Sequence, residues 1–238
     1  MTYANPNREI KLIQLGLIDF KEAWELQEKL FAELVTIKLA NRNSEAPKPV
    51  PNFMVVCEHP PVYTLGKSGT LDNLLANADE LHELGATFYQ INRGGDITHH
   101  GPGQLVVYPI LDLENFFTDI HLYLRTLEEI VIQTLADFGI SAGRYPKYTG
   151  VWIDSNGHNP RKICAMGVKC GRWITMHGLA LNIANDLSFF NHIIPCGIKE
   201  KSVTNMVSEI SNGTFTVEDV TARFLTHFSE IFNAELIT

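Results

Sequence analysis

Residues 92–109 read "NRGGDITHHGPGQLVVYP", so that a glycine-rich polar segment runs directly into an apolar one. Its first twelve positions hold four glycines, two adjacent histidines, an arginine and an aspartate. Glycine is used where the backbone bends unusually or approaches a ligand closely. The run "LVVY" is typical of a buried strand. The stretch therefore predicts a polar loop against a core strand, and a metal site, a phosphate cradle and a substrate-binding loop compete for it.

The flanking sequence alternates strands with helices. Strands are expected at 8–16 ("REIKLIQLG"), 53–59 ("FMVVCEH"), 87–92 ("TFYQIN") and within 147–184, where turns are expected at 156–157 and at Gly171. Helices are expected after Asp19 with Glu22 as a capping box, at 78–85 with Gly85 as its stop, from Thr118 to Gly139, and after Thr216 with Asp219. Long helices that flank runs of hairpin-connected strands indicate an α+β fold rather than a regular βαβ repeat.

Composition limits the class of protein. A chain of 238 residues with 45% hydrophobic residues can bury a substantial core, and no composition break divides it, so we expect one domain over residues 1–238. No stretch of about 18 apolar residues predicts a membrane span, and the first residues lack the apolar core of a secretory signal. Four cysteines do not resemble a disulfide framework. These features favour a cytoplasmic protein with free thiols.

The charge is uneven along the chain. A net charge of -8 argues against nucleic-acid binding. Residues 144–201 nevertheless carry eight Lys or Arg against three acids, a local charge of 8 - 3 = +5. This segment is either an ordinary solvated surface or a rim that meets an acidic partner. Its candidate rim residues are Lys147, Arg161, Lys169, Arg172, Lys199 and Lys201.

Two of the three kinds of site fit poorly. Adjacent histidines, His99 and His100, project to opposite sides of an extended chain, and Cys164 and Cys170 are six positions apart rather than two to four. No metal site is therefore expected. The segment "GGDITHHGPG" matches neither nucleotide-binding glycine pattern, because Pro102 and a strand follow where a helix would have to begin. A substrate-binding loop remains.

A candidate nucleophile lies at residues 193–198, "IIPCGI". Cys196 stands between a proline that fixes its φ angle and a glycine that lets the backbone turn, which suits a thiol that must be reached by substrate. Lys162 lies in the strand-like run "RKICAMGVK", and an ammonium beside a cysteine lowers the pKa of the thiol. The alternatives are a small buried cysteine and a lysine that faces water. Cys57 and Cys164 are expected in the core, and Cys170 beside a turn.

The blocks "RGGDITHHGPGQLVVYPI", "RKICAMGVK", "HGLALN" and "IIPCGI", in this order, closely resemble the lipoyl(octanoyl) transferases. This resemblance implies an α+β fold with a mixed, largely antiparallel sheet flanked by helices, like the catalytic domain of biotin and lipoate protein ligases. It implies an acyltransferase that moves an octanoyl group from octanoyl-acyl carrier protein to a lysine of lipoyl domains. The implied acceptors are the acyltransferase subunits of 2-oxoacid dehydrogenases and the glycine cleavage H protein.

The resemblance also implies roles for individual residues. Cys196 would carry the acyl thioester and Lys162 would lower its pKa, with no cofactor, ATP or metal. The implied substrate contacts are Arg93, Gly94, Gly95, Asp96, Ile97, Thr98, His99, His100, Ala165, Met166, Gly167, Gly178, Leu179 and Ala180. His99 departs from the family, which more often has an aromatic residue there. The residues of the first block are expected to fix the loop, although His100 is also a candidate for proton transfer.

Two alternatives remain open at this stage. An ATP-dependent lipoate-protein ligase would share the fold and a lysine but would need no nucleophilic cysteine. A non-catalytic module that binds a carrier protein would use Cys196 only as a structural residue. A covalent octanoyl adduct would distinguish an enzyme from the module, and ATP dependence would identify a ligase.

Overall fold

The computed structural model describes residues 6–194, 202–210 and 215–238. Its elements, in chain order, are β1 (Glu9–Leu17), α1 (Phe20–Asn41), β2 (Phe53–Glu58), β3 (Val62–Leu65), η1 (Leu71–Asn73), α2 (Ala78–Glu83), β4 (Thr87–Gln90), β5 (Ile97–His100), β6 (Gln104–Ile110), η2 (Leu113–Asn115), α3 (Ile120–Asp137), β7 (Ala142–Tyr145), β8 (Tyr148–Ile153), β9 (Arg161–Gly171), β10 (Ile174–Asn182), η3 (Leu187–His192), β11 (Ser202–Val203), α4 (Met206–Glu209), α5 (Val217–Phe232) and β12 (Glu235–Ile237).

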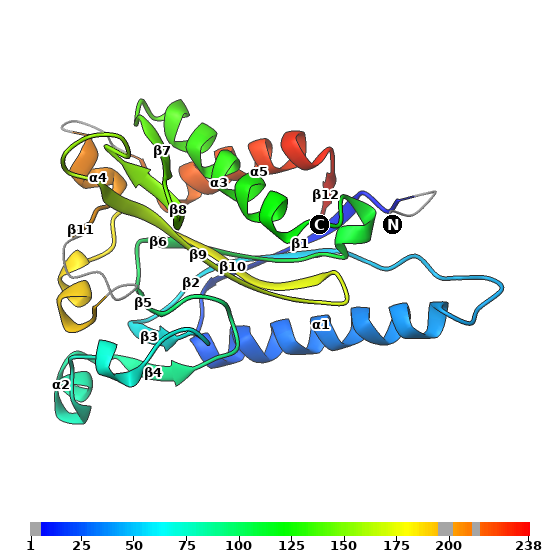
Figure 1. Ribbon diagram of the computed structural model, residues 1–238, viewed down its shortest axis with the longest axis horizontal. Coiled ribbons are helices and arrows are strands. Elements are labelled where there is room, and N and C mark those ends of the chain that lie inside the picture. Colours follow the sequence, from blue (N-terminus) through cyan, green and yellow to red (C-terminus); the bar gives the residue numbers. More distant parts are fainter. Residues whose placement is uncertain (1–5, 195–201, 211–214) are drawn as a thin grey trace.

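A nine-stranded sheet forms the centre, in the order β12-β1-β2-β6-β10-β9-β8-β7, with β11 added beside β9. The pairs of β1 with β12 and β2, and of β11 with β9, are parallel, whereas the path from β2 to β7 is antiparallel. Helices α3 and α5 cover one face and α1 the other (Figure 1). The mixed, largely antiparallel α+β fold expected from the sequence is thus confirmed. None of the helices in the described ranges combines the length and apolar content that a membrane span requires.

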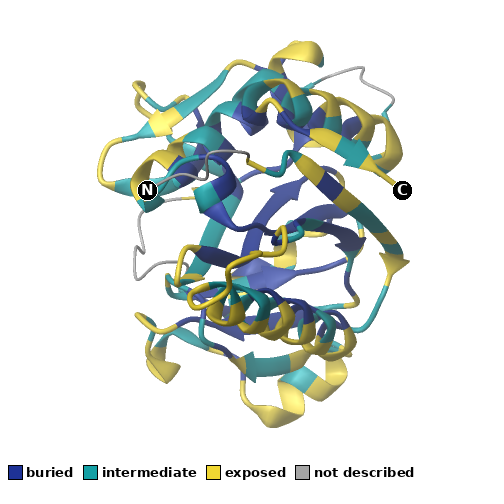
Figure 2. Cartoon of the chain, turned by 90° about the vertical axis from the view of Figure 1, so that its right-hand side faces the viewer, coloured by how far each residue is buried: buried dark blue, intermediate teal, exposed yellow. Residues whose placement is uncertain are grey.

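Strand β6 explains the apolar run "LVVY". Leu105 and Val107 point into the core under α3 and α5, whereas Val106 and Tyr108 point into the core under α1. All seven residues of the strand are buried, because both faces of the sheet are covered. Figure 2 shows the sheet as the buried centre of the molecule, with the exposed residues on the outer sides of the helices.

The helix ends follow the capping residues of the sequence. Asp19 accepts hydrogen bonds from the first backbone N–H groups of α1, and Thr216 forms a reciprocal capping box at the start of α5. The start of α3 differs from the prediction, because Asp119 rather than Thr118 caps it. Gly139 follows the end of α3 in a left-handed conformation, as glycine at a helix end is expected to do.

The predicted turn at Gly171 is displaced by one residue. Gly171 is still paired with Ile174 in the sheet, and the turn between β9 and β10 is made by Arg172 and Trp173. Both have positive φ angles, 54° and 65°, which match a two-residue hairpin whose twist follows that of its strands. Glycine pattern alone therefore located this hairpin to within one residue.

A second, three-stranded sheet in the order β4-β3-β5 lies beside α1 (Figure 1). Its strand β5 occupies part of the segment that the sequence predicts as a loop, and His99 and His100 belong to it. They project to opposite sides, as expected: His100 lies parallel to the ring of Phe20, and His99 stacks on Phe189 at 4.6 Å between ring centroids. The β5 pairing with β3 is what separates the two imidazoles.

Burial makes His99 an acid-sensitive part of the core. Its side chain is 1% exposed, neither ring nitrogen has a hydrogen-bond partner in the described structure, and burial lowers its pKa from 6.5 to about 3. Asp186, which favours the charged imidazole, and His192, which disfavours it, shift this pKa less than burial does. In the unfolded chain the His99 imidazole is protonated as pH falls below about 6.5, whereas in the native state it stays neutral until much lower pH.

We expect His99→Phe to make the protein less sensitive to acid. The wild type should lose roughly 1.4 kcal/mol of unfolding free energy per pH unit through His99 as pH falls from 6.5 toward 3, and the variant should not. Denaturant unfolding at pH 7, 6 and 5 measures this difference. His158→Phe, at an exposed position, is the control. Equal acid sensitivity of wild type and His99→Phe would contradict the prediction.

Candidate functional site

A cavity of about 300 Å³ lies between the segment Arg93–His100 and strands β9 and β10. It is lined by all the predicted substrate-contact residues except His99, and by Lys162. Lys147, expected only as a rim residue, also lines the cavity, and the rest of the wall was not predicted: it consists of Phe20, Ile91, Gln104, Tyr108, Leu124, Tyr148, Thr149, Val168, His177, Asn182, Phe190 and Val203. Gln104, His177 and Asn182 belong to the sequence blocks that carry the family resemblance, so their place in those blocks could have predicted that they line the cavity.

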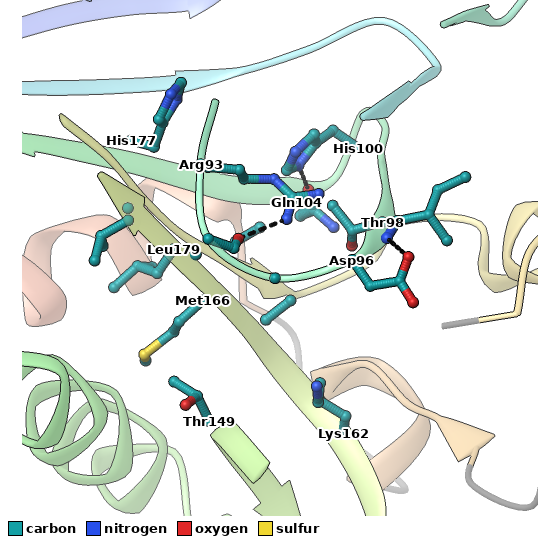
Figure 3. Close-up of a pocket in the computed structure, with 18 of the residues that line it drawn as sticks. Arg93, Asp96, Thr98, His100, Gln104, Thr149, Lys162, Met166, His177 and Leu179 are labelled. Atoms are coloured by element: carbon teal, nitrogen blue, oxygen red, sulfur yellow. Dashed lines mark hydrogen bonds between the residues drawn. The ribbon is translucent and has the colours of Figure 1, made fainter. Parts of the chain in front are cut away.

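Sheet register brings two separate blocks of the sequence together. Ala165, Met166 and Gly167 of β9 pair directly with Ala180, Leu179 and Gly178 of β10. Two short blocks that lie eleven residues or more apart in the sequence thus form one continuous patch of the cavity wall. Figure 3 shows Met166 and Leu179 on this wall, with Arg93 and His100 beyond it.

Glycines in the wall allow backbone to lie on backbone. The Gly94 N–H donates to the Val168 carbonyl at 2.9 Å, and a Cβ at Gly167 would stand 2.5 Å from the Gly94 carbonyl oxygen. A Cβ at Gly178 would collide with the Val107 carbonyl of the neighbouring strand. A Cβ at either position would therefore meet protein backbone first. The glycines hold the loop against the sheet.

Arg93 fastens this loop to the small sheet. Its side chain is 8% exposed, and Nη2 donates to the carbonyl and hydroxyl oxygens of Thr64 at 2.6 and 3.0 Å. Nη1 donates to the Gly94 carbonyl at 3.0 Å. A guanidinium with five donors can bridge several acceptors at once. These contacts agree with the expectation that Arg93 fixes the loop.

His100 belongs to a buried polar chain. Gln104 Nε2 donates to Asn182 Oδ1 at 2.8 Å, so its Oε1 faces His100 Nδ1 at 2.7 Å. That orientation puts the proton on Nδ1 and leaves Nε2 as an acceptor. Burial, and then the neighbouring His59, lower the pKa of His100 well below its usual value, so the imidazole is neutral. In Figure 3 His100 lies across the cavity from Lys162.

Lys162 lies within strand β9 and not in the preceding turn. Its Nζ lies 4.8 Å from the ring centroid of Trp152, a cation–π contact. Its aliphatic stem passes Gly150, where a Cβ would be 3.5 Å from Lys162 Cε. The Lys162 carbonyl accepts from the Thr204 N–H at 2.9 Å. The Lys162 side chain is half-buried and lines the cavity, so the alternative of a lysine in the preceding turn that faces water is wrong.

A buried carboxylate holds the strand that supports Lys162. Glu128 Oε1 accepts from the Gly150 N–H at 2.9 Å, while Oε2 pairs with Arg125 at 2.8 Å and Arg144 at 3.1 Å. The Glu128 side chain is fully buried, and a buried charge is stable only with such partners. Glu128 was not predicted from the sequence, because a glutamate inside a helix carries no local signal of its distant partners.

Cys196 lies outside the described residues, but both of its flanks are described. Before it, the Ile194 N–H donates to the Asn73 carbonyl at 2.8 Å. After it, Ser202 and Val203 of β11 pair with Arg161 and Lys162, and Val203 lines the cavity. The last described residue before Cys196 is therefore paired with η1, and the first strand after it is paired with β9 at Lys162.

The described cysteines do not suit nucleophilic chemistry. Cys57 and Cys164 are buried, as expected, and burial raises the pKa of both thiols strongly. Cys170 is exposed, as expected beside a turn, and partial burial of its sulfur raises its thiol pKa as well. Nucleophilic attack by cysteine requires the thiolate. Among residues 6–194, 202–210 and 215–238, no three His, Cys, Asp or Glu side chains gather to hold a metal ion.

Sequence comparison shows the family. Residues 19–229 match the model of the lipoyl protein ligase A/B catalytic domain. A protein of Christiangramia forsetii named octanoyltransferase is 54% identical over 97% of this chain and 98% of its own length. A second octanoyltransferase, from Flavobacterium johnsoniae, is 52% identical over 97% of this chain and 100% of its own length.

Solved structures show the same fold at low identity. Lipoate-protein ligase A bound with ATP superposes with a TM-score of 0.65 at 16% identity, over 98% of this chain and 90% of that one. The bi-partite lipoate protein ligase of Thermoplasma acidophilum gives a TM-score of 0.65 at 17% identity, over 98% of this chain and 88% of that one. The chain therefore belongs to the lipoyl protein ligase A/B catalytic domain family, and it is an acyltransferase of the octanoyltransferase branch.

Proposed function

We propose that the protein transfers an octanoyl group from octanoyl-acyl carrier protein to a lysine of lipoyl domains, through a thioester on Cys196. The observation that carries this proposal is the placement of Lys162. It lines the cavity and lies beside the strand that follows Cys196. The names of the relatives support octanoyl transfer, and the fold of the neighbours supports action in protein lipoylation.

The cavity walls suit a saturated acyl chain. Apolar side chains from different elements face the cavity, among them Leu124, Met166, Val168 and Leu179. Each CH₂ group removed from water contributes about 0.8 kcal/mol, so an octanoyl chain gains several kcal/mol here. The volume of about 300 Å³ lies at the lower end of the range for small-molecule sites. We therefore assign the predicted substrate contacts that line the cavity to acyl-chain binding, with Arg93, Asp96 and His100 supporting the wall.

The proposed chemistry consists of two balanced acyl transfers. The Cys196 thiolate attacks the carbonyl carbon of the carrier thioester, the C–S bond to the carrier breaks, and the carrier thiol takes up a proton. The neutral amine of the acceptor lysine then attacks the Cys196 thioester, an amide forms, and the Cys196 thiolate leaves. The acceptor nitrogen loses one proton in this second step. The free energy of thioester exchange is close to zero and that of amide formation is favourable, so the two-step reaction needs no ATP.

Lys162 has two duties in this scheme. As an ammonium it stabilises the Cys196 thiolate before each attack, since a nearby cation lowers the pKa of a thiol. As a neutral amine it accepts the proton that the acceptor lysine releases. The Trp152 ring holds the Nζ by its electron-rich face, and Gly150 leaves room for the stem. Both contacts come from β8, the neighbour of β9 on the side away from β11.

Cys196→Ala should abolish transfer while the fold persists, because the nucleophile is lost with little change in volume. Wild type mixed with octanoyl-acyl carrier protein, without ATP, should gain one octanoyl group in intact-mass spectrometry, and Cys196→Ala none. Cys170→Ser, at the exposed thiol, should acylate like the wild type. Transfer by Cys196→Ala at a near-native rate would exclude the covalent route, and incorporation of free octanoate only with ATP would favour a ligase.

Lys162→Ala should move the alkylation of Cys196 by iodoacetamide to higher pH, because the stabilising cation is removed. Lys162→Arg should keep the reactivity of Cys196 yet lose amide formation, since arginine stays protonated. Lys169→Ala is the matched control: it lies on the same strand with its Nζ 4.6 Å from the Phe31 ring, but does not line the cavity. An unchanged pH profile in Lys162→Ala would remove the pairing of Lys162 with Cys196.

The structure refines the candidate basic rim. Arg161 is paired with Glu209 at 2.5 Å, and Lys169 lies against Phe31, whereas Lys147 is exposed and lines the cavity. Lys199 and Lys201 lie outside the described residues. Lys147 is thus the described rim residue that is best placed to meet an acidic carrier protein as it delivers its thioester.

Lys147→Glu should raise the KM for octanoyl-acyl carrier protein and leave the reaction with a small octanoyl thioester nearly unchanged. Rim charges act mainly on association and are screened over about 8 Å at physiological salt. Steady-state kinetics at low and high salt measure the effect. Arg172→Glu makes the same charge change at the exposed hairpin beyond the far end of β9 and should have little effect. Equal effects of the two changes would argue for a general charge effect and against a rim at Lys147.

A further inference from the structure

A short pairing joins the chain before Cys196 to the turn after η1. Leu74 and Ile193 form an antiparallel bridge, with the Leu75 N–H donating to the His192 carbonyl at 2.9 Å. On the other side of the bridge, the Ile194 N–H donates to the Asn73 carbonyl at 2.8 Å. Ile194 is the last described residue before Cys196. The direction in which the chain leaves toward Cys196 is therefore set by the backbone of Asn73.

The side chain of Asn73 is itself held by the cavity loop. Asn73 Nδ2 donates to Asp96 Oδ2 at 2.6 Å, and the other carboxylate oxygen accepts from the Ile97 N–H at 2.7 Å. Hydrogen bonds to a carboxylate are about twice as strong as those between neutral groups. In Figure 3 the Asp96 carboxylate is turned away from Met166 and Lys162. Both oxygens of the Asp96 carboxylate therefore accept hydrogen bonds from protein groups.

The turn around Asp96 leaves little freedom. The Gly66 N–H donates to the Asp96 carbonyl at 3.2 Å, and a Cβ at Gly69 would overlap the Asp96 carboxylate. Gly66 and Gly69 belong to one turn, and Asn73 follows it in η1, whose start is capped by Thr70. The turn, Asp96 and Asn73 therefore form one packed unit, and the chain before Cys196 is attached to it.

From this arrangement we infer that Asn73 and Asp96 act together as positioning residues for the nucleophile. The inference rests on the proposed function, in which Cys196 attacks the thioester. Val203, on the far side of Cys196, is already paired with Lys162. Asn73 supplies an attachment for Ile194 before Cys196, as β9 does for Val203 after it. Asp96 thereby acts on the segment and not on substrate.

The direct test exchanges the two hydrogen-bonding groups. Asn73→Asp places two carboxylates in contact, and Asn73→Ala removes the donor. Both should lower the single-turnover rate of Cys196 acylation by octanoyl-acyl carrier protein roughly ten- to a hundredfold, as small misplacements of reacting groups do. The double variant Asn73→Asp with Asp96→Asn reverses the polarity of the same bond at unchanged net charge. It should recover most of the lost rate.

Two readouts separate positioning from simple loss of stability. In Asn73→Ala the pH midpoint for alkylation of Cys196 should rise, as in Lys162→Ala, because the thiol is no longer held near the ammonium. Unfolding alone would reduce the reactive fraction without moving that midpoint in the folded protein. Asn77→Ala is the matched control, since Asn77 caps α2 nearby and contacts neither Asp96 nor the chain before Cys196. It should change neither the rate nor the midpoint.

Wild-type rate and midpoint in both single variants would overturn the inference, and so would a double variant as slow as Asn73→Asp. Hydrogen exchange distinguishes this failure from failure of the proposed function. The peptide that contains Ile193 and Ile194 should exchange faster in Asn73→Ala, whether or not Cys196 is acylated. If the wild type gains no octanoyl group while this exchange still accelerates, the attachment is real and the proposed function is wrong.

Discussion

The cavity depends on one backbone contact, the hydrogen bond from the Gly94 N–H to the Val168 carbonyl on β9. The contact is possible because Gly167 offers no Cβ to the Gly94 carbonyl. It fastens the loop of the small sheet onto the large sheet, and Arg93 fastens the same loop to Thr64 on its other side. The space between loop and sheet is the cavity, so its size follows from how closely two backbones approach. Substitutions at Gly94 or Gly167 change this distance directly.

The polar groups around the cavity divide into two electrostatic classes. His100 and His177 are buried, and burial lowers the pKa of each, so both are neutral at physiological pH. Lys162 is half-buried and lies against Trp152. The two imidazoles therefore add no charge to the cavity wall, and the charged side chains that line it belong to other residues, Arg93 and Lys162 among them.

Much of the fold could be predicted from the sequence, because it rests on local signals. The capping residues Asp19 and Thr216 and the apolar run of β6 determine elements without reference to distant partners. Strand β5 was missed, because its pairing with β3 outweighs the loop character of its glycine-rich flanks. In the site, the quoted blocks located the cavity wall. The contacts of Asn73 and Glu128 were not predicted, because their partners lie 23 and 22 residues away and nothing near them in the sequence indicates the contact.

The two sheets contribute different halves of the proposed chemistry, which explains why contacts between them matter more than either sheet alone. Lys162 belongs to the large sheet, and the chain toward Cys196 departs from the turn that packs on the small sheet. A shift of one sheet against the other would change the distance between Ile194, the last described residue before Cys196, and Lys162 while both sheets stayed intact. Gly94, Arg93 and Asp96 all act against such a shift, from three neighbouring positions of one loop. The loop that first stands out in the sequence is therefore a wall of the cavity and also the connection that fastens the small sheet to the large one.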